Sequence, residues 1–152
     1  MVAASDVLLK KSIVDNSIEP GAKVIDALNR LNDLNLSYLV VQDGDDVVGI
    51  FSERDYARKV ILKGRNSTET TVAEVMSTDM PEVDFDAPIE TCMHLLASMS
   101  QRYLIVKEDG EFRGVITIHD LLREVLLHVD SRFDDELTKA LIDINEQPHK
   151  VY

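Results

Sequence analysis

A short pattern that joins a hydroxyl, a carboxylate and a basic side chain occurs twice in the chain. It has the form Gly-apolar-x-Ser/Thr-x-x-Asp, and the two copies begin at Gly49 and Gly114. A hydroxyl can bind a phosphate oxygen, and a carboxylate one helical turn later can accept hydrogen bonds from two vicinal hydroxyls, as acidic residues do for ribose in dinucleotide sites. The pattern therefore indicates two related nucleotide pockets. The residues concerned are Ser52, Arg54 and Asp55 in the first copy and Thr117, His119 and Asp120 in the second.

The same spacing also has a purely structural interpretation. A Ser or Thr at the junction of a strand and a helix, followed three residues later by an acid, is typical of a capping box, in which the two side chains satisfy each other's backbone N–H groups. Ser52 with Asp55 and Thr117 with Asp120 fit this description. The two interpretations are compatible, because a helix N-terminus offers N–H groups and a positive dipole end to phosphate.

The pattern is part of a longer repeat with a period of 65 residues. Val7 matches Val72 and Tyr38 matches Tyr103 in the same register, without a gap. An internal repeat fixes the architecture before any local interpretation. Two copies in a short chain predict two similar units that pair with pseudo-twofold symmetry and enclose a cleft.

Each repeat predicts the element order β-α-β-β-α, so the fold class is α/β (α+β). Apolar residues recur at helical spacing in one segment of each repeat, and hairpin-forming residues follow the next strand. The predicted strands are 16–19, 38–42 and 47–51 in the first copy and 82–85, 103–107 and 112–117 in the second. The predicted helices contain Val24, Leu28 and Leu31, or Ile89, Met93 and Leu96, and further helices begin near Glu53 and Ile118.

The repeats set the expected domain boundaries at 1–65 and 66–130, with a linker at 64–71. Residues 131–152 form a separate segment whose apolar side chains have helical spacing. These side chains are Phe133, Leu137, Ala140, Leu141 and Ile144. We expect an amphipathic C-terminal helix and tail that pack on the repeats or on a partner chain.

The chain resembles a tandem pair of cystathionine β-synthase (CBS) domains, a Bateman module, over about residues 7 to 128. The most specific stretch is GIFSERDYARKVILKGRNSTETTVAEVM, residues 49–76. It is similar to small stand-alone CBS-pair proteins of bacteria and plant organelles. The resemblance implies clefts that bind adenosine-containing ligands, with AMP, ADP or ATP favoured and NAD(H) or S-adenosylmethionine as further candidates. It also implies a homodimer.

The resemblance further implies a role for each matching residue. Asp55 and Asp120 match ribose-binding aspartates, and Ser52 and Thr117 match the hydroxyl residue that contacts phosphate or ribose. Arg54, His119 and Arg102 stand at positions that contact phosphate. Ile18 and Val83, in the short first strands, stand near the residues that wall the adenine.

Composition excludes several function classes. The net charge of −12 argues against nucleic-acid or anionic-membrane binding. No run of 18 apolar residues and no signal-peptide pattern is present. The single cysteine, Cys92, is expected to be small buried filler. Together these features predict a cytoplasmic protein. The histidines lack metal-ligand spacing.

One basic cluster stands out in this acidic chain: Arg58, Lys59, Lys63 and Arg65. It is either a solvated helix face, with an i,i+4 pair between Asp55 and Lys59, or a contact for phosphate or a partner. No nucleophile–base pair or pair of catalytic acids is recognisable, so we expect a non-enzymatic regulatory module that senses an adenosine nucleotide and acts on a partner in trans. The alternatives are a constitutive dimerisation scaffold with degenerate pockets, which depends on residues 131–152, and an enzyme that acts on a nucleotide.

Overall fold

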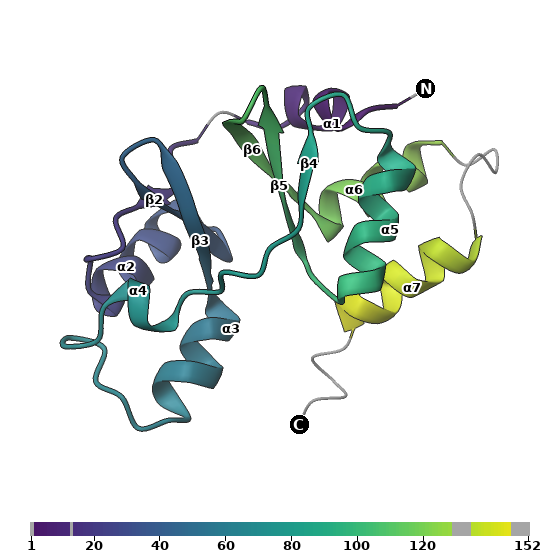
Figure 1. Cartoon of the computed structure of the whole chain (residues 1–152). Coiled ribbons are helices and arrows are strands. Elements are labelled where there is room, and N and C mark those ends of the chain that lie inside the picture. Colours follow the sequence, from purple (N-terminus) through teal and green to yellow (C-terminus); the bar gives the residue numbers. More distant parts are fainter. Residues whose placement is uncertain (1, 13, 129–134, 147–152) are drawn as a thin grey trace. The chain divides into compact units, whose positions relative to one another are not determined.

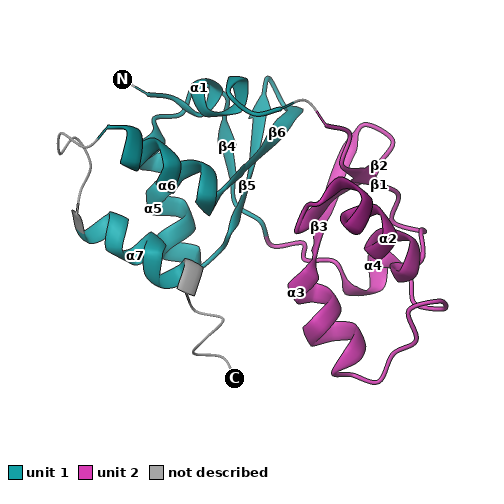
Figure 2. Ribbon diagram, turned by 180° about the vertical axis from the view of Figure 1, so that it is seen from behind, with its two compact units in different colours: residues 1–12, 80–152 teal, residues 13–79 magenta. Residues whose placement is uncertain are grey.

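The computed structural model describes residues 2–12, 14–128 and 135–146. The chain divides into two compact units (Figures 1 and 2). Unit 2 comprises residues 13–79, and unit 1 comprises residues 1–12 and 80–152. Each unit contains one three-stranded sheet. The two sheets and their helices confirm the predicted mixed α/β class with two repeats and a C-terminal helix, whereas the pseudo-twofold packing of the repeats stays a prediction.

Unit 2 contains the strands and helices expected of the first repeat. Its sheet has the order β1-β2-β3, with β1 parallel to β2 and β2 paired with β3 in an antiparallel hairpin. The elements are β1 (Ser17–Ile18), α2 (Val24–Leu34), β2 (Tyr38–Asp43), β3 (Asp46–Ser52), α3 (Glu53–Asp55), the π-helix η1 (Tyr56–Ile61) and α4 (Val72–Val75). The helix predicted from Glu53 thus has one α-helical turn and continues with the wider π geometry.

Unit 1 repeats this topology with the sheet order β4-β5-β6. Its elements are α1 (Ala4–Leu9), β4 (Glu82–Asp84), α5 (Ile89–Met99), β5 (Tyr103–Glu108), β6 (Glu111–Thr117), α6 (Ile118–Leu127) and α7 (Asp135–Glu146). The register of the hairpin shifts between Val41 and Gln42 in unit 2 and between Val106 and Lys107 in unit 1. The sequence repeat therefore extends to the position of a β-bulge.

The apolar periodicity that predicted the first helix of each repeat is confirmed by burial. Val24, Ala27 and Leu31 of α2 are buried, as are Ile89 and Leu96 of α5. Both helices end at a residue in the left-handed region, Asn35 (φ 53°) and Ser100 (φ 51°). This conformation turns the chain sharply into the following strand and satisfies the last helical carbonyls.

Each repeat begins with a short helix that the sequence analysis did not predict, and that helix packs with the other repeat. Ser5 N donates to Phe85 O at 2.8 Å in unit 1, and Ala73 N donates to Pro20 O at 2.9 Å in unit 2. The acceptors lie 65 residues apart, but the donors lie 68 apart. The two short helices therefore correspond at a spacing of 68 residues. The predicted match of Val7 with Val72, at a spacing of 65, is wrong by three residues in the structure. The expected boundary at 65/66 follows the sequence repeat, whereas the compact units divide the chain at 12/13 and 79/80.

Helix α7 packs on its own unit. Leu137, Leu141 and Ile144 are buried in the same hydrophobic core as Met93 of α5 and Leu121 of α6. The predicted apolar stripe is thus used inside unit 1, with Phe133 outside the described residues. No helix among the described residues is both long and apolar enough to cross a membrane.

Candidate functional site

The first motif forms a complete capping box at the start of α3. Asp55 Oδ2 accepts hydrogen bonds from Ser52 N at 2.9 Å and Ser52 Oγ at 3.0 Å, and Asp55 N donates to Ser52 Oγ at 3.3 Å. Ser52 and Asp55 are 6% and 5% exposed. The strand ends at the serine because its side chain takes over the hydrogen bonding of the first helical N–H groups.

The second motif repeats this geometry at the start of α6. Thr117 N donates to Asp120 Oδ2 at 2.9 Å, and Asp120 N donates to Thr117 Oγ1 at 3.2 Å. Asp120 is 7% exposed. The structural interpretation of both motifs as capping boxes is therefore confirmed. Each motif aspartate is nearly buried, with its Oδ2 bonded to the helix start.

In unit 2 the second oxygen of Asp55 has two partners. Lys59, one turn later on η1, places Nζ 2.9 Å from Asp55 Oδ1, which confirms the predicted i,i+4 pair. Ser77 Oγ donates to the same oxygen at 2.8 Å, and Lys59 Nζ lies 3.2 Å from that hydroxyl. A ligand hydroxyl that bonds to Asp55 Oδ1 must displace one of these two groups.

In unit 1 the cation comes from the leading segment of the chain. Lys11 Nζ donates to Asp120 Oδ2 and to Val115 O, each at 2.8 Å. Arg123 Nη1 lies 3.6 Å from Asp120 Oδ1, but its side chain is 69% exposed. Each aspartate therefore has a cation beside it, although the two cations come from different elements. Sequence reasoning missed Lys11, because it lies more than a hundred residues from Asp120 along the chain.

A buried acid, Glu124, was also missed. It takes the place of Lys59 in the 65-residue register, one turn after Asp120, and is 3% exposed. Lys10 Nζ donates to its Oε1 at 2.7 Å. Its Oε2 is buried without a hydrogen bond, and His128 Nδ1 is 3.7 Å away. Two like charges one turn apart are unfavourable on a helix, so Lys10 and Lys11 together compensate this pair.

The remaining basic residues of the predicted sites lie in varied surroundings. Arg54 is partly buried on α3, and His119 is exposed on α6. Arg102, before β5, donates from Nη2 to Ile144 O at 3.2 Å, near the end of α7. Cationic side chains near a helix C-terminus are stabilised by its dipole. Arg102 therefore contacts α7 in this structure, and its role toward phosphate stays a prediction.

The two residues expected to wall the adenine differ in their surroundings. Val83 of β4 is 8% exposed and packs in the hydrophobic core of unit 1. Ile18 of β1 lines a cavity of about 420 Å³ beside α2. Ser52, Arg54 and Asp55 are not among the residues that line that cavity, so a common pocket of Ile18 and the first motif stays a prediction.

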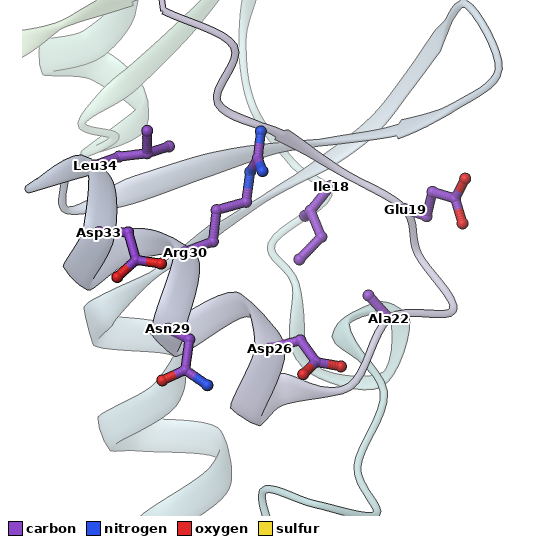
Figure 3. Close-up of a pocket in the computed structure, with 8 residues that line it drawn as sticks. All are labelled: Ile18, Glu19, Ala22, Asp26, Asn29, Arg30, Asp33 and Leu34. Carbon is purple, nitrogen blue, oxygen red and sulfur yellow. The ribbon is translucent and has the colours of Figure 1, made fainter.

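The cavity at Ile18 is acidic. Figure 3 shows Asp26 and Asp33 along α2, with Arg30 extending toward the segment that carries Ile18. Glu19 adds a third carboxylate to the lining, and the guanidinium of Arg30 donates to Asp15 O at 2.7 Å. Three carboxylates against one cation disfavour phosphate here. Hydrogen bonds from Ser17 hold the pKa of Asp15 below its usual value.

The described residues contain no group of three His, Cys, Asp or Glu side chains that could hold a metal ion. Cys92 is fully buried in the core of unit 1, as predicted. Burial raises the pKa of its thiol to about 11. It is therefore a packing residue, since a reactive cysteine needs access and a lowered pKa.

Comparison with known proteins places these two units in one family. The model of the CBS domain matches residues 4–61 and 72–127. The mitochondrial CBS domain-containing protein CBSX3 of Arabidopsis thaliana is 32% identical over 108 residues, which are 68% of this chain and 52% of that protein. The chain spans about half the length of such curated relatives (53% and 52%).

Solved structures of CBS-domain proteins have the same fold. A protein with CBS domains from Burkholderia ambifaria MC40-6 has a TM-score of 0.76 and 32% identity, covering 88% of this chain and 99% of that one. The CBS domain protein PAE2072 from Pyrobaculum aerophilum, solved in complex with AMP, shares the fold with a TM-score of 0.71 at 19% identity, over 84% of this chain and 98% of that one. With two matched copies that cover well over half of its residues, the chain belongs to the CBS domain family.

Proposed function

We propose that this chain is a non-enzymatic regulatory module that binds an adenosine nucleotide and acts on a partner protein in trans. The observation that carries the proposal is the duplicated capping box. In each unit it sets a nearly buried carboxylate and a hydroxyl at a helix N-terminus, with an exchangeable cation beside the carboxylate. Family membership supports the ligand class, and the Pyrobaculum protein of the same fold holds AMP.

Ligand recognition follows from these groups. The ribose hydroxyls donate to Asp55 or Asp120, as vicinal hydroxyls do to acids in dinucleotide sites. The phosphate accepts a hydrogen bond from the hydroxyl residue and is favoured by the positive dipole end of the helix start. Arg54, Arg102 and His119 supply positive charge, and Ile18 and Val83 lie in the strands expected near the adenine. AMP, ADP and ATP are the first candidates, with NAD(H) and S-adenosylmethionine next.

Thermal unfolding against a ligand panel tests the proposal. AMP, ADP, ATP, NAD⁺, NADH and S-adenosylmethionine are added to protein freed of bound nucleotide, with GTP as the control. A ligand at one hundred times its Kd adds about 2.7 kcal/mol to the free energy of unfolding. We expect stabilisation by at least one adenosine ligand and none by GTP.

Two carboxylate variants locate the binding. Asp55→Asn and Asp120→Asn together should abolish the shift, whereas Asp46→Asn, an exposed acid in the β2–β3 hairpin, should leave it intact. Absence of a shift with every ligand, or an undiminished shift in the double variant, contradicts the proposal.

One observation favours assembly as a second candidate function. Ile61 and Leu62 at the end of η1 are 56% and 73% exposed, and Leu126 and Leu127, at the same register positions of α6, are 74% and 64% exposed. Duplicated apolar pairs on the surface are typical of a contact surface. We propose that they join two copies of the chain in a homodimer.

The oligomeric state checks this second candidate. Leu62→Glu with Leu127→Glu should convert a dimer to a monomer in sedimentation experiments, whereas Leu9→Glu, at a side chain that is 77% exposed, should not. A dimer that forms without any nucleotide-dependent stabilisation would favour the scaffold. The scaffold would then not rest on the apolar face of α7, because that face packs inside unit 1.

A further inference from the structure

Unit 2 contains a second, smaller cavity that is cationic. Its volume is about 290 Å³, and it lies between the end of η1 and the short helix α4. Three basic side chains and one acid line it together with Val75: Lys59, Lys63, Arg65 and Glu74. In a chain with a net charge of −12, this local excess of positive charge favours a small anion over an extended polyanion.

Lys59 connects this cavity to the first motif. Its Nζ lies 2.9 Å from Asp55 Oδ1, while its side chain lines the cavity and is 42% exposed. A hydroxyl that bonds to Asp55 Oδ1 takes over part of the role of this ammonium group. Lys59 can then turn its charge toward an anion in the cavity without leaving a buried carboxylate unpaired.

The other cations of the cavity are available at its rim. Lys63 and Arg65 are exposed, and Arg65 Nη1 lies 3.5 Å from Glu74 Oε2 with both side chains about half exposed. An ion pair this exposed contributes little to stability. A phosphate group can therefore replace Glu74 as the partner of Arg65 at low cost, and guanidinium groups bind phosphate in a bidentate manner.

The second repeat has lost this arrangement. In the 65-residue register Lys59 corresponds to Glu124 and Lys63 corresponds to His128. Glu124 is buried and bonded to Lys10, so an acid stands where unit 2 offers an ammonium group. The charge difference predicts that the two motifs do not take the same ligand.

We propose that the cationic cavity of unit 2 binds the terminal phosphates of an adenosine di- or triphosphate whose ribose is held at Asp55. The inference rests on the proposed function for the adenosine part and on the cavity for the phosphate part. Free tripolyphosphate shares the phosphate chemistry and is the probe that separates the two. The first motif thus prefers ATP or ADP to AMP, and the second motif has no such preference.

The double variant Lys63→Ala/Arg65→Ala tests the cavity while leaving Lys59 beside Asp55. Isothermal titration calorimetry of the full chain measures the Kd of ATP, ADP, AMP and tripolyphosphate. Removal of two exposed cations should weaken ATP and tripolyphosphate binding about tenfold and leave AMP binding unchanged. The matched control is Arg58→Ala, which removes an exposed cation of η1 that does not line the cavity.

Glu74→Gln changes the affinity in the opposite direction. It removes the one carboxylate among the described lining residues and frees Arg65, so ATP binding should tighten about threefold. Because Glu74, Lys63 and Arg65 are all exposed, these variants should keep the thermal unfolding profile of the wild type.

The outcomes separate the cavity from the proposed function. Three results would overturn the proposed binding of terminal phosphates in the cavity. They are an equal loss of ATP and AMP binding in the double variant, the same loss in Arg58→Ala, and an unchanged affinity for ATP and tripolyphosphate. If tripolyphosphate binds and requires Lys63 and Arg65 while no adenosine ligand binds, the phosphate cavity stands and the adenosine part of the proposed function fails.

Discussion

Replacing Gly49 by alanine tests the close approach of Met76 and Ser77 to strand β3, which leads into the first motif. A Cβ atom at this position would lie 2.7 Å from Ser77 O and 2.8 Å from Met76 Sδ. The oxygen belongs to a backbone that exchanges two hydrogen bonds with Ile50, each 2.9 Å long. The added methyl group can therefore be accommodated only by moving this backbone and lengthening those bonds.

The expected cost follows from these two effects. Overpacking of a well-filled site costs about 1–3 kcal/mol, and a weakened backbone hydrogen bond costs about 0.5–1.5 kcal/mol. We expect Gly49→Ala to lower the free energy of unfolding by about 2–4 kcal/mol. For a chain of 152 residues this corresponds to a fall in Tm of roughly 5–12 °C.

Two other glycines provide a comparison. At Gly114 the nearest atom to an added Cβ is Leu8 Cδ2 at 2.9 Å, on a flexible side chain that can turn away, but the φ of 159° strains a residue with a Cβ, so Gly114→Ala should cost about 1–3 kcal/mol. At Gly21 no atom lies within 4 Å, so Gly21→Ala should be neutral or stabilising by about 0.4–1 kcal/mol.

Urea unfolding followed by circular dichroism measures all three variants. Gly49→Ala and Gly114→Ala should both be more destabilising than Gly21→Ala. A Gly49→Ala variant within about 0.5 kcal/mol of wild type would refute the close approach of Ser77, since surface substitutions fall in that range. Equal costs at Gly49 and Gly21 would show that the effect belongs to glycine itself and not to the contact.

Three further predictions concern the two capping boxes, Cys92 and the Lys10–Glu124 pair. Ser52→Ala and Thr117→Ala should each lower the free energy of unfolding by about 1 kcal/mol, measured with urea, because both capping boxes have the same geometry; a loss in only one would contradict this. Cys92 should react with a thiol reagent at pH 8 only after denaturant is added, because its thiol is buried with a pKa of about 11. Lys10→Met should cost about 1–3 kcal/mol and more than Glu124→Gln, because it leaves a buried carboxylate without its ammonium partner; the reverse order in urea unfolding would argue against that pair.

The strands and main helices of each repeat could be predicted from the sequence, because local pattern alone determines them. A short apolar run marks β2 and helical spacing marks α5, while Ser52 with Asp55 marks a helix start whichever function the motif serves. Repetition at a fixed period strengthened each local prediction, since two weak signals in the same register rarely agree by chance.

The contacts between distant segments could not be predicted in this way. Nothing near Asp120 in the sequence points to Lys11, and the short helices α1 and α4 each bond to the other repeat, far away along the chain. The helices α1 and α4 also repeat at a spacing three residues longer than that of the strands, so the 65-residue repeat does not align them with each other. One signal was present, however: Glu124 replaces Lys59, so an acid beside Asp120 required a cation from elsewhere.

The cations beside the two motif aspartates come from different elements, so a ligand that displaces them would disturb different parts of the structure. At the first motif Lys59 belongs to the same helix as Asp55, so its displacement stays local to that helix. At the second motif Lys11 belongs to the leading segment, so a ligand that takes its place on Asp120 removes a contact that holds this segment. A ligand shifts an equilibrium only through a difference in its affinity for two states. Under the proposed function, the Lys11–Asp120 pair would supply such a difference for the second motif, whereas the first motif would report on the ligand's phosphate groups without moving the segment that carries Lys11.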